Sequence, residues 1–373
     1  MKGHIRKRGR KWCFVLDIGP DPITGRRRQK WFSGYDTKRA CERAMAEKIT
    51  EIHRGDYIEP AQIPLRELLH DWLEQEVRPE TSISTFVTYS GIVNNHIIPS
   101  IGGTKLNQLK PIHFQKLYTL KHQAGLAAST IRLIHNVCRR AMGWAVRMGM
   151  LHRNPVEQAR PPKLVRKEMK FWTAEQVQRF LESAEDSPYY TAFYTAIFTG
   201  MRMGELRALK WSDVDWEGNR ISIRRRVQFK RGETVIQSGT KTSKNGRVIA
   251  VSESVIAHLK KHRLNQLKQR LQNGSGSDWI FQSTTGDILP DITLYKAFVR
   301  LTKKAGLPQI RFHDLRHTHA TLLLQQGVHP KIVSERLGHS TVSITLDTYS
   351  HVIPTMQKEA AEMFDALFQG NAR

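Results

Sequence analysis

The sequence has few acidic residues, few cysteines and no long apolar run. Asp and Glu number 34 against 59 Lys and Arg, which gives the 373 residues a formal net charge of +25. This excess of positive charge predicts a polyanionic partner, and it favours nucleic acid over a membrane surface. No apolar run approaches the roughly 20 residues that a spanning helix needs, so we expect no membrane association.

The cysteines and the N-terminal segment bear on the cellular setting of the chain. Cys13, Cys41 and Cys138 are scattered and lack C-x-x-C spacing, so the sequence predicts neither a disulfide framework nor a zinc knuckle. The N-terminal segment lacks the apolar core of a signal peptide, and we therefore expect a cytoplasmic protein. A ribosomal or chromatin protein could share this charge, but such proteins seldom contain so many Trp and Leu.

Changes in composition and periodicity divide the chain into three predicted domains. Residues 1–58 predict a small three-stranded β-sheet plus a helix, and residues 63–158 predict an all-α bundle of four helices. Residues 159–170 form a basic linker, and residues 171–373 predict a mainly α domain with a small antiparallel β-sheet. The predicted fold class is therefore multidomain α+β.

The basic residues of the first two domains are candidate DNA contacts. In the first domain a basic arm leads into strands that also carry Trp12, Trp31 and Phe32, which favours a groove-binding β-ribbon over a merely solvated surface. In the bundle, the basic side of the helix predicted over residues 129–150 either clamps phosphates or faces solvent. The apolar stripe of that helix consists of Ile131, Ile134, Val137, Cys138, Ala141, Met142 and Ala145. The candidate contacts are Lys7, Arg8, Arg10, Lys11, Arg26, Arg27, Arg28, Lys30, Arg139 and Arg140.

The third predicted domain opens with a capping box formed by Thr173 and Gln176, and a second helix is predicted over residues 188–199. The segment TGMRMGEL then places Glu205 three residues after Arg202, where the carboxylate can orient or neutralise a neighbouring cation. An isolated Arg–Glu pair is more often a surface ion pair of little energetic value.

A sheet and a terminal helix flank the most informative segment of this domain. Residues 211–252 predict one three-stranded antiparallel sheet, with Lys241 and Lys244 at a hairpin. A lysine there is normally solvated, but it can also reach a leaving oxygen. Apolar residues at helical spacing predict an amphipathic helix over residues 355–368, which packs on its own domain or on a neighbour.

The segment that runs from RFHDLRH to Tyr349 holds the densest set of chemically active side chains. His313 and Arg316 lie one turn apart on a predicted helix, His339 follows a helix end, and Tyr349 lies ten residues further on. A guanidinium, two imidazoles and a phenol together indicate an oxyanion site, because Arg can hold phosphate in bidentate fashion while Tyr attacks it. Phosphate in nucleic acid is the expected ligand.

These residues also have simpler interpretations. A tyrosine after a helix is most often a packing residue. His313 and His317 at i, i+4 could bind zinc. A metalloprotease helix would carry Glu at the second position, whereas this helix carries Asp314 there and places Arg316 between the two histidines.

Five motifs in order resemble the tyrosine recombinase, or phage integrase, family. They are TGMRMGEL, a β-hairpin lysine in TKTSKNGR, HDLRH, LGHS, and a tyrosine ten residues after the LGHS histidine. The likeness spans nearly the whole chain. Its order of arm-binding domain, helical core-binding (SAM-like) domain and catalytic domain is similar to that of integrases of temperate phages and conjugative transposons.

The resemblance implies roles for individual residues. Tyr349 would be the nucleophile that attacks the scissile phosphate and becomes linked to the 3′ phosphate, freeing a 5′ hydroxyl. Arg202, Arg316 and His339 would bind the nonbridging oxygens. His313 would hydrogen-bond the phosphate or help to position the nucleophile.

The remaining implied roles concern the leaving group and the support of the site. Lys241 would protonate the leaving 5′ oxygen, and Lys244 is the alternative because a hairpin slip of three residues exchanges them. Glu205 would support the Arg and His geometry. The resemblance implies no metal, no other cofactor and no ATP, since the covalent intermediate stores the phosphodiester energy.

The resemblance also implies the biological reaction and its partners. The protein would integrate, and with a helper excise, a mobile element through two strand exchanges and a Holliday junction. Its partners would be double-stranded DNA with core-type and arm-type attachment sites, three further copies in a homotetramer, an excisionase and a host DNA-bending protein. The setting would be the nucleoid of a bacterial host. The alternatives are a relaxase-like topoisomerase and a DNA-binding regulator with vestigial catalytic motifs.

Overall fold

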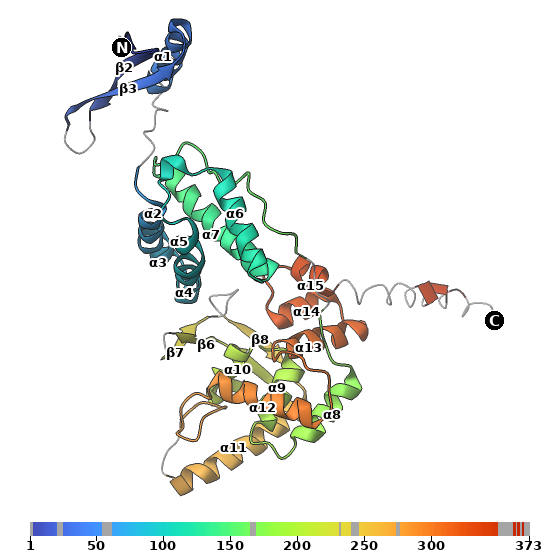
Figure 1. Ribbon diagram of the computed structural model, residues 1–373. Coiled ribbons are helices and arrows are strands. Elements are labelled where there is room, and N and C mark those ends of the chain that lie inside the picture. The colour runs from blue at the N-terminus through green and yellow to red at the C-terminus, as the bar shows by residue number, and fades with distance from the viewer. Residues whose placement is uncertain are drawn as a thin grey trace. The chain divides into compact units, whose positions relative to one another are not determined.

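The computed structural model describes residues 3–20, 25–53, 62–164, 169–230, 233–239, 246–273 and 277–349, together with residues 361, 362, 364, 365 and 368 (Figure 1). The chain divides into two compact units, Met1–Val165 and Arg166–Arg373. Lys241 and Lys244, and most of the helix predicted over residues 355–368, lie outside the described residues. Within the described part of the chain, no helix has both the length and the apolar character that crossing a bilayer requires.

The first unit begins with an antiparallel sheet and one helix that packs on it (Figure 1). Strands β1 (His4–Arg8), β2 (Lys11–Pro20) and β3 (Arg27–Tyr35) pair in that order, and α1 (Lys38–His53) follows. Alternation along β2 buries Phe14 and Leu16, and Cys41 of α1 completes a small core with them. The basic segment that was expected as an arm is itself an edge strand, because the backbone of β1 pairs with β2.

The rest of the described first unit is a helical bundle, as predicted. Two of its long helices contain π-helical turns: α2 (Leu65–Trp72), η1 (Leu73–Val77) and α3 (Arg78–Glu80) are continuous, and so are α4 (Ile83–Ile92), η2 (Val93–Ile97) and α5 (Ile98–Ile101). Pro79 and Pro99 follow the π turns, whose wider geometry accommodates a residue without an N–H. The bundle is completed by η3 (Leu106–Gln108), α6 (Pro111–Gln123) and α7 (Ala128–Arg147).

The apolar stripe predicted on α7 is confirmed as part of the bundle core. All of its members are buried: Ile131, Ile134, Val137, Cys138, Ala141, Met142 and Ala145. They pack with Trp72 and Phe114 from other helices. After α7 the chain returns to the same core through Val156 and Ala159.

The second unit is mainly helical, which confirms the predicted α+β fold class. Its helical elements are α8 (Ala174–Ala184), α9 (Tyr190–Thr199), α10 (Met203–Arg207), η4 (Trp211–Asp213), α11 (Glu253–Asn273), α12 (Asp291–Lys304), α13 (Asp314–Gln325), α14 (Pro330–Leu337) and α15 (Val342–Tyr349). The predicted capping box of α8 is present. The Gln176 N–H donates to Thr173 Oγ1 at 3.3 Å, and the Thr173 N–H donates to Gln176 Oε1 at 3.0 Å.

The strands of the second unit form two sheets, so the prediction of one sheet over residues 211–252 is wrong. One sheet has the order β4 (Val214–Asp215), β5 (Arg220–Ile223) and β8 (Arg247–Ala250), while β6 (Arg225–Lys230) and β7 (Glu233–Ser238) form a separate hairpin. The alternating pattern continues through a break at Arg224 and does not reveal it. After the break, Arg225 pairs with the buried Asp213 at 2.9 and 3.2 Å, which draws β6 away from β5.

Gly200 ends α9 at the point where three helices meet. Its φ of +63° is left-handed, and a Cβ there would lie 2.7 Å from the side chains of His319 in α13 and Leu337 in α14. Both the backbone conformation and the packing therefore require glycine. This contact fixes α13 and α14 against the start of the TGMRMGEL segment.

Replacing Gly200 with Ala should destabilise the second unit more than the same change at Gly327. Gly327 also has a left-handed φ, +77°, but open space surrounds it. We expect Gly200→Ala to lower the free energy of unfolding by about 2–4 kcal/mol, from strain and overpacking together, and Gly327→Ala by about 1 kcal/mol, from strain alone. Urea denaturation measures both losses. Equal losses would contradict a tight three-helix contact.

Candidate active site

Arg202 precedes α10 and forms the predicted pair with Glu205. Its backbone N–H donates to Glu205 Oε2 at 3.1 Å, and its Nη1 donates to Oε1 at 2.8 Å. Gly204 lets this turn lie against β6, because a Cβ there would approach the Val227 carbonyl oxygen at 2.6 Å. Since the Glu205 side chain is only 1% exposed, the pair is not the surface ion pair that is usual for such spacing.

A second guanidinium, that of Arg247 at the start of β8, completes a buried charge network around Glu205. Its Nη1 and Nη2 donate to the two carboxylate oxygens at 3.1 and 2.8 Å, and its Nε donates to the Arg336 carbonyl oxygen at 3.1 Å. Burial by itself would raise the pKa of Glu205, but the hydrogen bonds and charges of Arg247 and Arg202 lower it to about 2. One ionised carboxylate is therefore shared between two cations.

Arg316 lies in the first turn of α13 and is 2% exposed. Its Nη1 donates to the Gly200 carbonyl oxygen at 3.0 Å. Its Nη2 is buried and has no hydrogen-bond partner within the described residues. Burial and the nearby charge of Arg202 lower the pKa of Arg316 to about 9. A buried guanidinium with an unused donor is a candidate anion site, because an anion would satisfy both the donor and the charge.

His339 directly follows α14, whose C-cap is Gly338 with a left-handed φ of +68°. Arg202 Nη2 donates to the Gly338 carbonyl oxygen at 3.3 Å, and a Cβ at this glycine would lie 2.9 Å from the Arg247 side chain. His339 Nδ1 is 2.7 Å from Thr345 Oγ1. Burial and the neighbouring arginines lower the pKa of His339 to about 4, so its ring is neutral at pH 7.

Tyr349 is the last residue of α15, and its side chain is fully buried. It belongs to a small core made of Ala320, Leu324, Val333, Leu337 and Tyr349 itself. Its hydroxyl lies 2.8 Å from Nδ1 of His317. Burial raises the pKa of Tyr349 to about 12, although the charge of Arg316 acts in the opposite direction. The phenol is therefore protonated at neutral pH and lies within reach of the Arg316 charge.

His313 is an exposed residue at the start of α13. Its ring stands nearly perpendicular to the His317 ring with the centroids 5.2 Å apart, and the centroid of the His317 ring in turn lies 5.8 Å from that of the Tyr349 ring. Partial burial of the ring and the charge of Arg316 lower the pKa of His313. Two imidazoles and the phenol thus form a row beside the buried guanidinium.

The described structure unites most of the predicted site. Arg202, Arg247 and Arg316 with Glu205, called the arginine cluster below, lie beside His339 and Tyr349. The candidate general acids Lys241 and Lys244 lie outside the described residues, and the predicted roles of all these residues stay predictions. In the described part of the chain, no group of three or more His, Cys, Asp or Glu side chains is placed to hold a metal ion.

Two residues of the site were missed in the sequence. Arg247 directly follows the predicted Asn245-Gly246 turn, which places it at the start of a strand, but nothing local links it to Glu205. His317 lies four residues after His313 on the same helix face, and it was considered only as a zinc ligand. Its helical spacing from His313 was the signal that could have placed it in the site.

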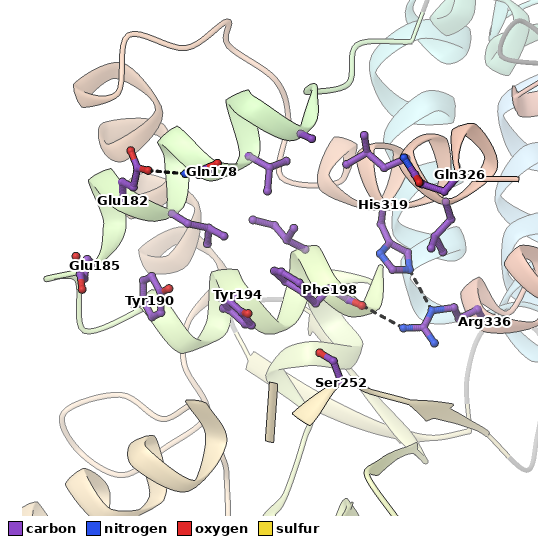
Figure 2. A pocket seen from close by; sticks show the side chains of 16 residues that line it. Gln178, Glu182, Glu185, Tyr190, Tyr194, Phe198, Ser252, His319, Gln326 and Arg336 are labelled. Atoms are coloured by element: carbon purple, nitrogen blue, oxygen red, sulfur yellow. Dashed lines mark hydrogen bonds between the residues drawn. The ribbon is translucent and has the colours of Figure 1, made fainter. Parts of the chain in front are cut away.

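A cavity of about 810 Å³ lies beside α8, α9 and α13 and is distinct from the site (Figure 2). Its lining is mostly apolar, and Figure 2 shows His319 and Arg336 together on one side of it. Arg336 Nε donates to His319 Nε2 at 3.2 Å, and its Nη2 donates to the Phe198 carbonyl oxygen at 3.1 Å. No member of the arginine cluster lines this cavity, and neither does Tyr349.

The candidate DNA contacts of the first unit lie mainly on its surface. Exposed are Lys7, Arg8, Arg10, Lys11, Arg26, Arg27, Arg139 and Arg140, and half-buried are Arg28 and Lys30. Lys11 pairs with Asp36, and Arg27 pairs with Asp17. Arg6 follows Ile5, which packs against the small core of this sheet. The guanidinium carbon of Arg6 lies 4.1 Å from the centroid of the exposed Trp31 ring.

Comparison with known proteins covers all three predicted parts of the chain. Residues 170–356 match the phage integrase family, residues 65–121 match the phage integrase N-terminal SAM-like domain, and residues 4–52 match the arm DNA-binding domain. A tyrosine recombinase XerC-like protein of Caldanaerobacter subterraneus subsp. tengcongensis is 31% identical over 98% of this chain and 99% of its own length. The ICEBs1 integrase of Bacillus subtilis is 31% identical over 74% of this chain and 76% of its own length.

Solved structures have the same fold. The Tn1549 transposon integrase in complex with transposon right end DNA is similar with a TM-score of 0.70, at 21% identity, over 81% of this chain and 99% of that chain. A lambda integrase tetramer bound to a Holliday junction is similar with a TM-score of 0.59, at 21% identity, over 93% of this chain and 95% of that chain. The match to the phage integrase family includes the whole arginine cluster and Tyr349. The chain belongs to the phage integrase family, as a tyrosine recombinase of the phage or transposon type.

Proposed function

We propose that this protein cuts and rejoins DNA through a covalent bond between Tyr349 and a DNA phosphate. The Tyr349 oxygen attacks the scissile phosphorus, and the bond from phosphorus to the 5′ oxygen breaks. A 3′-phosphotyrosyl link and a free 5′ hydroxyl result, and rejoining is the reverse step with a new 5′ hydroxyl. The observation that carries the proposal is the buried Nη2 of Arg316, unpaired within the described residues, beside a buried tyrosine. Transesterification at phosphate needs such a pair.

The charge balance of the arginine cluster supports an anionic substrate. It holds three guanidinium groups and one carboxylate, which pairs with Arg202 and Arg247, and burial together with the charge of Arg202 depresses the pKa of Arg316. A phosphodiester would supply the missing negative charge. The nonbridging oxygens gain further charge in the five-coordinate transition state, so donors held in place beforehand would lower the barrier.

The histidines of the site would bind the phosphate as neutral groups. The Thr345 hydroxyl can donate to Nδ1 of His339, which leaves the ring proton on Nε2. Nε2 would then donate to a nonbridging oxygen. His313, which is exposed at the start of α13, would hydrogen-bond the same phosphate.

Lys241 would give a proton to the leaving 5′ oxygen, and Lys244 is the alternative. Arg247 follows them closely in the chain and contacts Glu205, which supports a lysine from this segment as the general acid. The reaction would need neither a metal ion nor ATP. The arginines would supply the positive charge that a metal supplies elsewhere, and the phosphotyrosyl bond would retain the energy of the broken phosphodiester.

The proposed cellular role is integration of a mobile element and, with a helper, its excision. Residues 1–58 would bind arm-type sites, residues 63–158 core-type sites, and residues 171–373 would carry out catalysis. Four copies would exchange strands in two steps through a Holliday junction, which is supported by the likeness to a lambda integrase tetramer bound to such a junction. An excisionase and a host DNA-bending protein are the proposed partners, at the nucleoid of a bacterial host.

Tyr349→Phe removes the attacking oxygen and should abolish covalent attachment to DNA. Wild-type protein incubated in EDTA with a nicked suicide substrate from the element's own attachment site should form an adduct that resists SDS. The variant should bind the same DNA and form no adduct. An adduct with the variant would contradict the role of Tyr349. Specific binding without any wild-type adduct would favour a DNA-binding regulator, and an adduct that forms only without EDTA would contradict metal independence.

Glu205→Gln should weaken both the fold and DNA cleavage. Without the carboxylate, Arg202 and Arg247 lose their buried counter-charge, at a cost of about 3–5 kcal/mol of unfolding free energy. Asp213→Asn is the matched control, because Asp213 is also buried and binds Arg225 through both carboxylate oxygens, outside the arginine cluster. At a temperature where both variants stay folded, only Glu205→Gln should slow single-turnover cleavage. Equal slowing would contradict a role for Glu205 in orienting the arginines.

The stability of the second unit should depend on pH through Glu205. Its pKa is about 2 in the folded protein, below the ordinary value of 4.5. A lowered pKa stabilises the fold above pH 4.5, and this contribution, about 3 kcal/mol, is lost as the pH falls from 4.5 to 2. The unfolding free energy of the wild type should fall more steeply over this range than that of Glu205→Gln. Parallel curves in denaturant titrations would refute the linkage.

A further inference from the structure

His317 contacts the proposed nucleophile. Its Nδ1 is 2.8 Å from the Tyr349 hydroxyl oxygen, well within hydrogen-bond distance. It follows Arg316 in α13, and the charge of that guanidinium acts on both His317 and Tyr349. His317 is therefore the imidazole in contact with the atom that would attack phosphorus.

The protonation states of the two partners allow the hydroxyl to be the donor. Burial raises the pKa of Tyr349 to about 12, so the phenol keeps its proton at neutral pH. Burial and the neighbouring His313 lower the pKa of His317 to about 4, so its ring is neutral. A neutral imidazole has one accepting nitrogen. With the ring proton on Nε2, Nδ1 accepts the hydrogen bond from the Tyr349 O–H.

We propose that His317 is the general base that takes the proton from Tyr349 during cleavage. The O–H bond of Tyr349 breaks and the proton passes to Nδ1, while the bond from the phenolic oxygen to phosphorus forms. The bond from phosphorus to the 5′ oxygen breaks, and that oxygen takes a proton from the general acid, Lys241. In rejoining, the imidazolium returns its proton to the phenolic oxygen as the phosphotyrosyl bond breaks. This inference rests on the proposed function, because it names the group that accepts the Tyr349 proton in the proposed cleavage step.

His313 is less suited to this task. The residue is exposed and its ring packs against the His317 ring, with centroids 5.2 Å apart, whereas the His317 ring packs against Tyr349. A base must lie within hydrogen-bond reach of the proton that it removes, and His317 meets this requirement. In the proposed reaction, His313 therefore contacts the phosphate and His317 contacts the nucleophile.

Binding of DNA would itself strengthen the base. The titratable and charged groups around the ring are Arg311, His313, Asp314 and Arg316 on its own segment, His339 after α14, and Tyr349 of α15. Most of these are cations or can become cations, and they disfavour an imidazolium. A phosphodiester held by Arg316 offsets that charge and favours proton transfer to His317. Without DNA, burial keeps the nucleophile protonated.

His317→Ala tests the proposal in single-turnover cleavage of the nicked suicide substrate by the full-length protein. We expect cleavage to slow by about 10²–10⁴-fold, the usual contribution of a general base, with unchanged affinity for DNA. His258→Ala is the matched control, since it alters a half-buried histidine of α11 outside the arginine cluster. It should cleave at the wild-type rate. Wild-type cleavage by His317→Ala would overturn the proposal.

A fluorinated tyrosine in place of Tyr349 separates proton transfer from positioning. Its phenol is more acidic and loses the proton without a base, so it should restore most of the lost rate in His317→Ala once the pH exceeds the pKa of that phenol. Recovery would support the general base even if the variant is less stable than the wild type. A variant that binds DNA but stays equally slow with the fluorinated residue would overturn it and leave His317 a positioning residue.

A substrate with sulfur in place of the bridging 5′ oxygen identifies the side of the reaction on which His317 acts. Its thiolate leaves without a general acid, so this substrate should rescue Lys241→Ala and not His317→Ala. Rescue of His317→Ala would place the histidine at the leaving group and overturn the proposal. Failure of the proposed function is a different result, because the wild type itself would then form no adduct.

Discussion

The site depends on one buried carboxylate that holds two arginines close together. Like charges repel strongly in a protein interior, where the effective dielectric constant is low. Glu205 makes the approach of Arg202 and Arg247 favourable, and Arg316 remains with an incomplete set of partners within the described residues. Because Arg247 also binds the Arg336 carbonyl oxygen, the same network joins α10, β8 and α14. Fold stability and the proposed anion binding therefore depend on a single set of ion pairs.

Backbone groups complete the alignment of the arginines. The Gly200 carbonyl oxygen accepts from Arg316 and the Gly338 carbonyl oxygen accepts from Arg202. Both glycines have left-handed backbones, and neither has room for a Cβ. Gly200 of the TGMRMGEL motif and Gly338 of the LGHS motif are thus explained by helix ends that bring carbonyl oxygens and guanidinium groups together, and they carry no chemistry of their own.

The sequence predicted features whose signal is local, and it failed where the signal depends on tertiary contacts. The α7 stripe and the α8 capping box follow from spacing within one helix, and both are present. The contact between Arg247 and Glu205 joins residues far apart in the chain, and so does that between His317 and Tyr349. The break at Arg224 was missed because the alternating pattern continues across it.

The placement of Tyr349 in a small core has a consequence for the timing of the reaction. That core is separate from the large core of the second unit, and α15 packs mainly on α14. A short helix held by so few buried side chains can detach by local opening, at a free energy below that of global unfolding. In the proposed reaction, the rate of strand cleavage is then the product of an opening equilibrium and an intrinsic chemical rate. Contacts that hold or release α15 can therefore gate the enzyme without altering the arginine cluster.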